Sequence, residues 1–364
     1  MDKKKYSVCV YAICKNEETF AKRWMNSMQE ADKVVVLDTG STDKTVEILR
    51  SLGAEVSVKE ISPWRFDVAR NASLDLVPED IDICVCTDLD EVFHPGWREK
   101  LEAAWGDDVG QGKYRYTWSF LPDGKEGVVF WGEKIHKRKG YLWVHPVHEV
   151  LRYKGTEAEG KRVNIEGVQL DHYPDPKKSR GQYLPLLELS VREEPEDDRN
   201  MHYLGREYMF YGRHADCIET LKRHLSMKTA LWQDERCASM RYIARSYWAL
   251  GNEEEAEKWF LRSVAEAPYL REPWLDYAKF ALARQEWELV LWLSLRALQI
   301  RHRAQSYINE AESFGSLPYD LASLGFYYTG RYKKALSYVE EAIRLSPDDE
   351  RLRQNKIWME KALS

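Results

Sequence analysis

The stretch "KVVVLDTGSTDKTVEILRSLG", Lys33 to Gly53, decides the fold of the N-terminal half of the chain. Its opening, Lys33–Asp38, is short, β-branched and apolar, as expected of a buried strand. A turn of Thr, Gly, Ser and Asp follows, in which Ser41 or Thr42 is expected to cap a helix. Apolar residues then recur at helical spacing until Gly53, which is expected to end the helix. The stretch therefore predicts a strand followed directly by a helix.

Similar units lie on both sides of this stretch, so strands and helices alternate from the N-terminus onward. Strands are expected at Tyr6–Cys14, Ala54–Glu60 and Ile81–Asp88, and helices at Glu17–Glu30 and Asn71–Leu76. Alternating apolar strands and helices indicate a mostly parallel, Rossmann-like α/β sheet that is covered on both faces. Ligands bind at the carboxyl ends of such strands, where Asp38 and Asp88 are expected to lie.

From about Asp198 the pattern changes to pairs of helices with an internal repeat. The copies that begin at Met240 and Trp274 are separated by the roughly 34-residue period of the tetratricopeptide repeat. Further copies begin at Met201 and Tyr319. The repeat positions share Gly212, Gly251 and Gly330 at the turn between helices, Ala256 and Ala335 where helices approach closely, and Pro268 and Pro347 at the end. The longer gap before Tyr319 predicts either an insertion or an extended helix.

The two halves meet near Asp171–Gln182, which contains two prolines among turn-forming residues. We therefore predict an α/β domain over residues 1–177 and an all-α repeat domain over residues 178–364. A helix is expected over Lys178–Glu193, at the start of the second domain.

Composition excludes several classes of protein. The net charge of −6 leaves no basic excess for a nucleic-acid partner. No apolar run approaches the ~18–20 residues of a transmembrane segment, and Lys15, Glu17 and Glu18 interrupt the pattern of a signal peptide. The six cysteines lack CxxC spacing and are expected to be buried, reduced thiols. A cytoplasmic location is the expectation.

Three carboxylates follow the fourth predicted strand in "ICVCTDLDEVFHPGW", Ile83 to Trp97. Asp88 and Asp90 are one residue apart and can bring two carboxylates to a hard cation such as Mg²⁺ or Mn²⁺. Such a cation could bridge a diphosphate and stabilise its departure. The alternative is a solvated acidic turn. Asp38 likewise ends a predicted strand and is followed by Thr39 and Gly40. Its carboxylate either accepts a hydrogen bond from a base or a ribose, or forms part of a turn that caps the next helix.

The segments "KNEE", "VLDTGSTDKT", "ARNASL" and "CTDLDE" resemble, in order and spacing, the family-2 glycosyltransferases with a GT-A fold, over roughly Ser7–Val92. "YLWVHPVHEVL" and "LDHYP" are similar to elements of the subset that carries C-terminal tetratricopeptide repeats. The sublancin-type peptide S-glycosyltransferases share this plan. Thr39 departs from the Asp or Asn of many members, which would shift base recognition to Asp38 or to the backbone.

The resemblance implies a metal-dependent, inverting glycosyltransferase, specifically a hexosyltransferase, that uses Mn²⁺ or Mg²⁺ and a nucleotide sugar, which is expected to be UDP-linked. It implies that Asp38 and Thr39 contact the base, and that Arg70 contacts the base or diphosphate. The remaining matched nucleotide-sugar positions are Cys14, Asn16, Glu17, Gly40, Asp88 and Leu89.

The resemblance also implies the metal ligands and the general base. Asp90 would bind the metal, Asp88 the metal or ribose, and His148 the metal or diphosphate. Inversion needs a base on the acceptor side, for which Glu149 is the first candidate and Glu91 the second.

Other aromatic residues and histidines have two interpretations each. His172 is either a metal-side group or a domain-interface residue, and His145 either belongs to the site or marks a turn. Trp118, Trp131 and Trp143 either line an acceptor pocket or pack in the core. Exposed or capping roles are expected for His202, His214, His224 and His302.

Two other functions are alternatives to glycosyl transfer. A sugar-nucleotide-binding scaffold without activity would commonly lose the acidic motif, which is intact here. A nucleotidyltransferase would need a basic Gly-rich loop after the first strand, and "AICKNEE" has none. In the enzyme, the repeats would recruit a peptide, protein or glycan acceptor, or form a homodimer, on a concave surface.

Overall fold

The structure is a computed structural model that describes residues 6–121, 123–156, 158–175 and 181–363. It divides into two compact units, the first ending at Ser190 and the second beginning at Val191. The boundary expected between residues 177 and 178 lies outside the described residues, as does the start of the expected Lys178–Glu193 helix. The described part of that helix is α5, Tyr183–Glu193.

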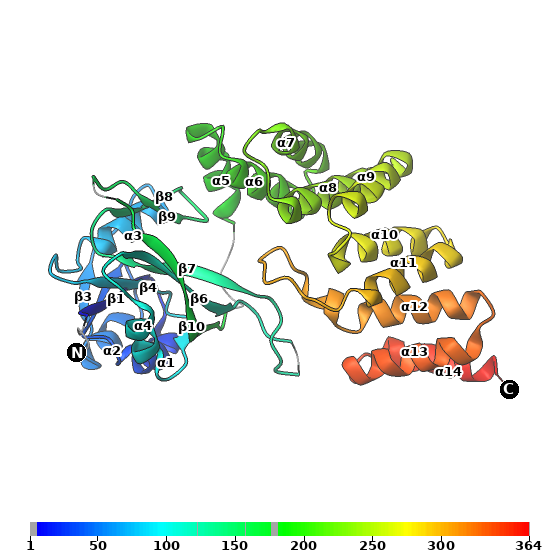
Figure 1. The fold of residues 1–364 in the computed structure, drawn as a ribbon, viewed down its shortest axis with the longest axis horizontal. Helices are drawn as coiled ribbons and strands as arrows, with labels where there is room; N and C mark the ends of the chain where they lie inside the picture. The colour runs from blue at the N-terminus through cyan, green and yellow to red at the C-terminus, as the bar shows by residue number, and fades with distance from the viewer. Residues whose placement is uncertain (1–5, 122, 157, 176–180, 364) are drawn as a thin grey trace. The chain divides into compact units, whose positions relative to one another are not determined.

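The first unit is built on an eight-stranded sheet, in the order β3-β2-β1-β4-β7-β6-β10-β5 among the described residues (Figure 1). The pairs β3–β2, β2–β1 and β1–β4 are parallel, which confirms the predicted parallel sheet. β7 pairs antiparallel with both β4 and β6, and β5 antiparallel with β10. The strands of the sheet are β1 Val8–Cys14, β2 Lys33–Asp38, β3 Glu55–Val58, β4 Ile83–Cys86, β5 Glu91–Phe93, β6 Val109–Thr117, β7 Val129–Lys137 and β10 Lys161–His172. A separate hairpin joins β8, Tyr141–Val144, to β9, Val150–Tyr153.

The helices of this unit are α1 Glu18–Met28, α2 Thr45–Ser51, α3 Phe66–Leu74 and α4 Trp97–Ala104. α1 buries Ala21, Trp24, Met25 and Met28, a single stripe at helical spacing that packs with the β1 and β2 side chains. The cap predicted for α2 is wrong, because the helix begins at Thr45 and not after Ser41 or Thr42.

Strand register brings distant residues to one edge of the sheet. Cys14 lies opposite Asp38, so β1 and β2 end together. Val85 lies opposite Ile135 in the antiparallel β4–β7 pair, which carries the preceding residue, Lys134, toward the end of β4. His172 lies opposite Glu91 in the β10–β5 pair.

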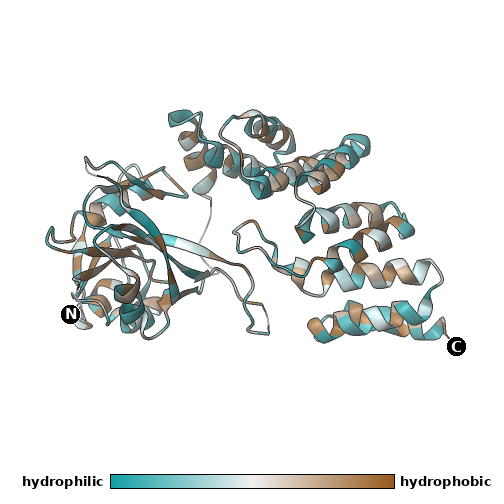
Figure 2. Ribbon diagram, viewed as in Figure 1, coloured by the Kyte–Doolittle hydropathy of each residue, from teal (hydrophilic) through white to brown (hydrophobic). Residues whose placement is uncertain are grey.

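The second unit is a series of helix pairs: α6 Asp198–Phe210 with α7 His214–Ser226, α8 Gln233–Ala249 with α9 Glu253–Glu266, α10 Arg271–Ala283 with α11 Trp287–Gln299, and α12 Leu317–Tyr328 with α13 Tyr332–Leu345, followed by α14 Glu350–Lys361. Gly212, Gly251 and Gly330 have φ of 71°, 75° and 78°, a conformation that glycine adopts without strain at these turns. Figure 2 shows polar and apolar residues interleaved along these helices, as expected where each has a buried face.

The structure tests what was expected of the long gap and of the histidines in the repeats. The extended-helix alternative for the long gap is wrong, since only the 3₁₀ turn Ala311–Phe314 (η1) is helical between α11 and α12 in the described chain. Exposure is also wrong for His202 and His224, which are 1% and 0% exposed, although His302 is exposed as expected. In the described parts of the chain, no helix combines the length and hydrophobicity needed to cross a bilayer.

The packing of α11 against α12 gives a test of the repeat fold. A Cβ at Gly325 would lie 2.8 Å from Leu291 Cβ and 3.0 Å from Leu291 N, so the neighbouring backbone would have to move. Gly→Ala in an open helix stabilises by about 1 kcal/mol. We expect Gly325→Ala instead to destabilise the repeats by about 1–3 kcal/mol, as overpacking does.

Thermal unfolding of the full chain measures this effect. Gly315→Ala is the control, because a Cβ there would meet its nearest atom at an ordinary 3.5 Å. An increase in melting temperature for Gly325→Ala would contradict the close α11–α12 packing.

Candidate active site

The candidate active site lies at the edge where the parallel strands β1, β2 and β4 end. β1 ends at Cys14 and β2 at Asp38, while Asp88, Asp90 and Glu91 follow β4. Most of the polar residues predicted for the site are therefore brought to one edge of the sheet by strand topology alone.

The loop after β2 is organised by the Asp38 carboxylate, which is fully buried. Its Oδ1 accepts hydrogen bonds from the backbone N–H of Gly40 at 3.0 Å and of Ser41 at 2.8 Å. Its Oδ2 accepts from the Ser41 hydroxyl and from Cys14 Sγ. Both oxygens thus hold the loop in place through Cys14, Gly40 and Ser41.

The loop after β1 is tied to the same turn. The Asn16 side chain accepts from Thr42 N at 2.8 Å, and Glu17 N donates to Thr45 Oγ1 at 2.7 Å. The Thr39 hydroxyl donates to the Cys14 carbonyl at 3.0 Å. These contacts shape the backbone of two adjacent loops. Leu89, by contrast, packs in the main core of the unit.

Asp88 lies between two cations. Its Oδ1 accepts from Arg70 at 2.6 Å, and its Oδ2 accepts from Lys134 Nζ at 2.8 Å. Burial alone would raise the pKa of Asp88, but the charges of Arg70 and then Lys134 outweigh it and hold the pKa well below its ordinary value. Asp88 is therefore ionised, and it orients both cations at the end of β4.

Glu91 is 1% exposed and hydrogen-bonded on both oxygens. Oε1 accepts from Tyr116 at 2.7 Å and from Lys134 at 3.1 Å, while Oε2 accepts from Asp88 N at 2.8 Å. Burial raises the pKa of this carboxyl. The contacts fix the turn that carries Asp88.

Glu149 reaches the same group of charges through Arg70. Its Oε1 accepts from Arg70 Nε at 2.9 Å, and the Glu149 side chain is 12% exposed. The neighbouring His148 has a positive φ of 52° and its ring lies against Tyr183. His145 is also buried at a positive φ, of 80°, in the loop after β8.

Asp90 faces His172. Asp90 Oδ2 is 3.6 Å from His172 Nε2, and both side chains are largely buried. His172 Nδ1 lies 2.9 Å from the Trp118 carbonyl, which fixes it as the protonated nitrogen and turns Nε2 toward Asp90. Burial alone would lower the pKa of His172, but the contact with Asp90 outweighs it and raises the pKa.

The aromatic candidates divide between surface and core. Trp118 is 47% exposed and stacks on His172 with ring centroids 4.4 Å apart. Trp143 is buried and donates to Tyr11 at 2.8 Å, a core role. Trp131 is half-buried in β7.

Two residues of the site were missed by sequence reasoning, Lys134 and Tyr116. Both come from strands beyond the matched segments, and only the antiparallel pairing of β7 with β4 and β6 brings them to the acidic turn. A lysine within an alternating strand carries no signal of this, because its partners are more than forty positions away in the chain.

The Asp90–His172 contact predicts a pH dependence of stability. Since the pKa of His172 is raised in the folded chain, the contact stabilises fully below the unfolded pKa of about 6.5 and its effect is lost as pH rises through the folded pKa. We expect the melting temperatures of the wild type and Asp90→Asn, both in EDTA, to differ more near pH 6 than near pH 9. The control is Asp171→Asn, which removes a different Asp–His pair, that of Asp171 with His94. If the difference in melting temperature between the wild type and Asp90→Asn does not change with pH, the assignment of a stabilising Asp90–His172 contact is contradicted.

Both parts of the chain match known protein families. Residues 9–145 match the family model described as glycosyl transferase family 2, and residues 243–269 and 319–349 match a tetratricopeptide repeat model. An uncharacterized glycosyltransferase of Rickettsia bellii (strain RML369-C) is 35% identical over 96 residues, which are 26% of this chain and 31% of that protein. One of Rickettsia typhi (strain ATCC VR-144 / Wilmington) is 45% identical over 58 residues, 16% of this chain and 19% of that protein.

The chain thus spans less than a third of the length of these relatives. Among solved structures, MamA is similar with a TM-score of 0.38 and 15% identity, over 49% of this chain and 99% of that one. The matched models show that the chain carries a family-2 glycosyltransferase domain in its N-terminal part and tetratricopeptide repeats in its C-terminal part.

Proposed function

We propose that the chain is a metal-dependent, inverting glycosyltransferase that moves a sugar from a UDP-linked donor to a peptide, protein or glycan acceptor. The observation that carries the proposal is the charge arrangement at the end of β4. Asp90 and His172 face each other at 3.6 Å, beside an Asp88 carboxylate held between Arg70 and Lys134. The choice of UDP rests on the resemblance of the strand-end motifs to the family.

The Asp90–His172 pair fits a divalent cation. Its two facing atoms are a carboxylate oxygen and an imidazole nitrogen, both accepted by Mn²⁺. The His172 ring is held by the Trp118 carbonyl on its other nitrogen, as ligating histidines commonly are. Asp90 and His172 would hold the ion, which when bound would neutralise charge on the departing diphosphate. Both Asp88 oxygens already accept from cations, so we assign Asp88 to orienting them.

Arg70 and Lys134 are proposed to stabilise the leaving diphosphate. Each cation is fixed by two carboxylates. Arg70 contacts Asp88 and Glu149. Lys134 contacts Asp88 and Glu91. Donors fixed in advance stabilise developing negative charge without the cost of reorienting at the moment of reaction. Three carboxylates, Asp88, Glu91 and Glu149, thus fix the two cations.

Glu149 is proposed as the general base. It would take the proton of the acceptor hydroxyl, amine or thiol while the new bond forms at the anomeric carbon and the bond to the diphosphate breaks. Glu91 is less suited, because both of its oxygens accept hydrogen bonds in a buried position. The Glu149 contact with Arg70 would also link the acceptor side to the leaving-group side.

The base of the donor is proposed to lie on the paired loops after β1 and β2. Because the Asp38 carboxylate and the Thr39 hydroxyl are used within these loops, backbone groups would read the base. The repeats would bind the acceptor or a second copy of the chain. The six cysteines are buried and unpaired with one another, which favours the cytoplasmic location proposed for the enzyme.

The cation sites predict losses of donor turnover. In hydrolysis of UDP-sugars with Mn²⁺, we expect Asp90→Ala and EDTA each to abolish activity, and Lys134→Met to lower it by about 10²–10³-fold, as loss of one transition-state donor does. Lys137→Met is the matched control, since this lysine of the same strand donates to the Asp107 carbonyl away from the site. If hydrolysis of UDP-sugars persists both in EDTA and in the Asp90→Ala variant, the metal-dependent mechanism is wrong. A chain that binds UDP-sugars tightly but turns none over would support the inactive-scaffold alternative.

The general base predicts a separation of binding from turnover. We expect Glu149→Gln to lower turnover by about 10²–10⁴-fold, with donor affinity measured by calorimetry within about threefold of wild type. The amide keeps the shape of the side chain and an oxygen that can accept from Arg70. Unchanged turnover in Glu149→Gln would remove Glu149 from the mechanism.

A further inference from the structure

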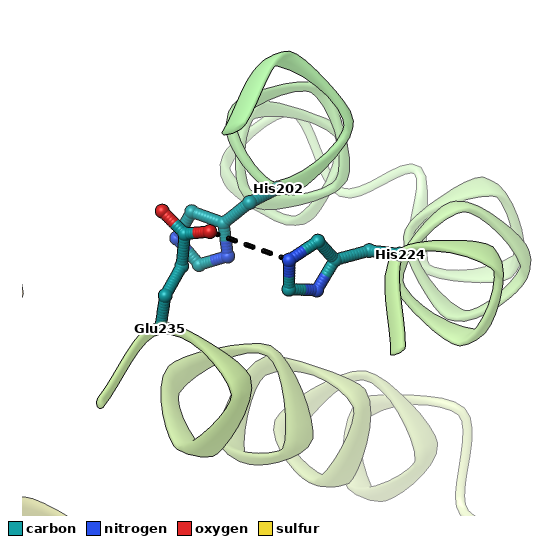
Figure 3. Close-up of side chains that lie close together, drawn as sticks. All are labelled: His202, His224 and Glu235. Atoms are coloured by element: carbon teal, nitrogen blue, oxygen red, sulfur yellow. Dashed lines mark ion pairs between the residues drawn. The ribbon is translucent and has the colours of Figure 1, made fainter. Parts of the chain in front are cut away.

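Three buried titratable side chains converge in the repeat unit, far in sequence from the strand-end site. His202 comes from α6, His224 from α7 and Glu235 from α8, as Figure 3 shows. They are 1%, 0% and 4% exposed. Each offers one ligand atom such that all three atoms lie within 4.8 Å of one another. Because buried charged or polar groups are costly unless paired, this arrangement requires an explanation.

Ser239 orients both histidines. Its Oγ lies 2.7 Å from His202 Nδ1 and 3.0 Å from His224 Nδ1. A hydroxyl oxygen has two lone pairs, so it can accept an N–H from both rings. Both rings would then present an unprotonated Nε2, the form that binds a metal.

His224 Nε2 is the atom that points to a ligand. It is buried, and within the described chain it has no hydrogen bond of acceptable geometry. Glu235 Oε1 lies 3.3 Å from it. Two ligands on a tetrahedral ion with bonds of about 2.0–2.1 Å are separated by about 3.3–3.4 Å. The separation therefore suits two ligands of one ion.

The second carboxylate oxygen is already engaged. Glu235 Oε2 accepts from the Tyr307 hydroxyl, from the segment between α11 and η1. This contact orients the carboxylate and leaves Oε1 toward His224. A carboxylate held by an outer hydrogen bond is a common feature of metal sites.

We propose that His202 Nε2, His224 Nε2 and Glu235 Oε1 bind one divalent transition-metal ion, with Zn²⁺ the best match to two imidazoles and a carboxylate. The ion would join three successive helices at the start of the repeats. Its burial assigns it a structural role. The proposal is independent of the glycosyl transfer proposed above.

Cobalt(II) is the probe, because it takes Zn²⁺ sites and absorbs visible light with an intensity that reports tetrahedral coordination. The full chain carries Asp90→Asn, so that the strand-end site does not contribute, and is first dialysed against chelator. We expect one equivalent of Co²⁺ to produce the tetrahedral spectrum, Zn²⁺ to displace it, and either ion to raise the melting temperature.

Variants in this Asp90→Asn chain identify the ligands. We expect His224→Asn and Glu235→Gln each to weaken Co²⁺ binding at least about 100-fold, and Ser239→Ala to weaken it about 10–100-fold as an outer partner. Glu235→Gln is nearly isosteric, so it distinguishes a metal ligand from a hydrogen-bond acceptor. Circular dichroism shows whether each variant folds, and Glu235→Gln and Ser239→Ala decide the result if His224→Asn does not fold.

His214→Asn is the matched control. His214 also comes from α7 and contacts a serine, Ser246, at 3.4 Å, but it belongs to no such cluster in the described structure. It should leave Co²⁺ binding unchanged. The proposal is overturned if the parent chain gives no tetrahedral Co²⁺ spectrum and no thermal shift with Zn²⁺, or if Glu235→Gln binds Co²⁺ as tightly as the parent. It is also overturned if His214→Asn loses as much affinity as His224→Asn.

Discussion

The hold of Arg70 and Lys134 on the Asp88 carboxylate is the interaction on which the candidate site depends. Arg70 comes from α3, Lys134 from β7, and Asp88 from the turn after β4, so one side chain joins three elements. Glu149 extends the group to the chain after β8 through Arg70. Breaking a buried ion pair commonly costs about 3–5 kcal/mol. The Asp88 side chain is 32% exposed, which places its contribution below that range.

The first half of the sheet could be predicted because each element has a local signal. Lys33–Asp38 is the strand that its β-branched run predicted, and β1 and β4 lie within the expected ranges. The parallel order then brings Asp38 and Asp88 to one edge without further information. Lys134 and Tyr116 could not be found in this way, because their positions depend on antiparallel pairing between strands that are distant in the chain. The start of α2 was misplaced because Asp43, Ser41 and Thr42 are all good capping residues. In the structure the Ser41 side chain contacts Asp38 and the Thr42 side chain contacts Asn16.

The repeats show a similar division. Turn glycines and helix periodicity predicted the helix pairs, since these follow from backbone geometry. The burial of two histidines could not be predicted from the sequence. Exposure was expected for them because most polar residues of helical repeats face solvent. His202 and His224 are buried where a serine and a glutamate from α8 meet them. Such groups arise from contacts between helices, and no local pattern in one helix reports them.

The loop held by Asp38 has a consequence for molecular recognition. Its shape is maintained by the hydrogen bonds that the Asp38 carboxylate accepts from Cys14, Gly40 and Ser41, so it would be formed before the proposed donor binds. A ligand that docks on a preformed surface spends little of its binding free energy on ordering the protein. Discrimination among nucleobases would then reside in the contour of the main chain. Changing one exposed side chain would do little to alter it, whereas inserting or deleting a residue between β2 and α2 would reshape the whole surface.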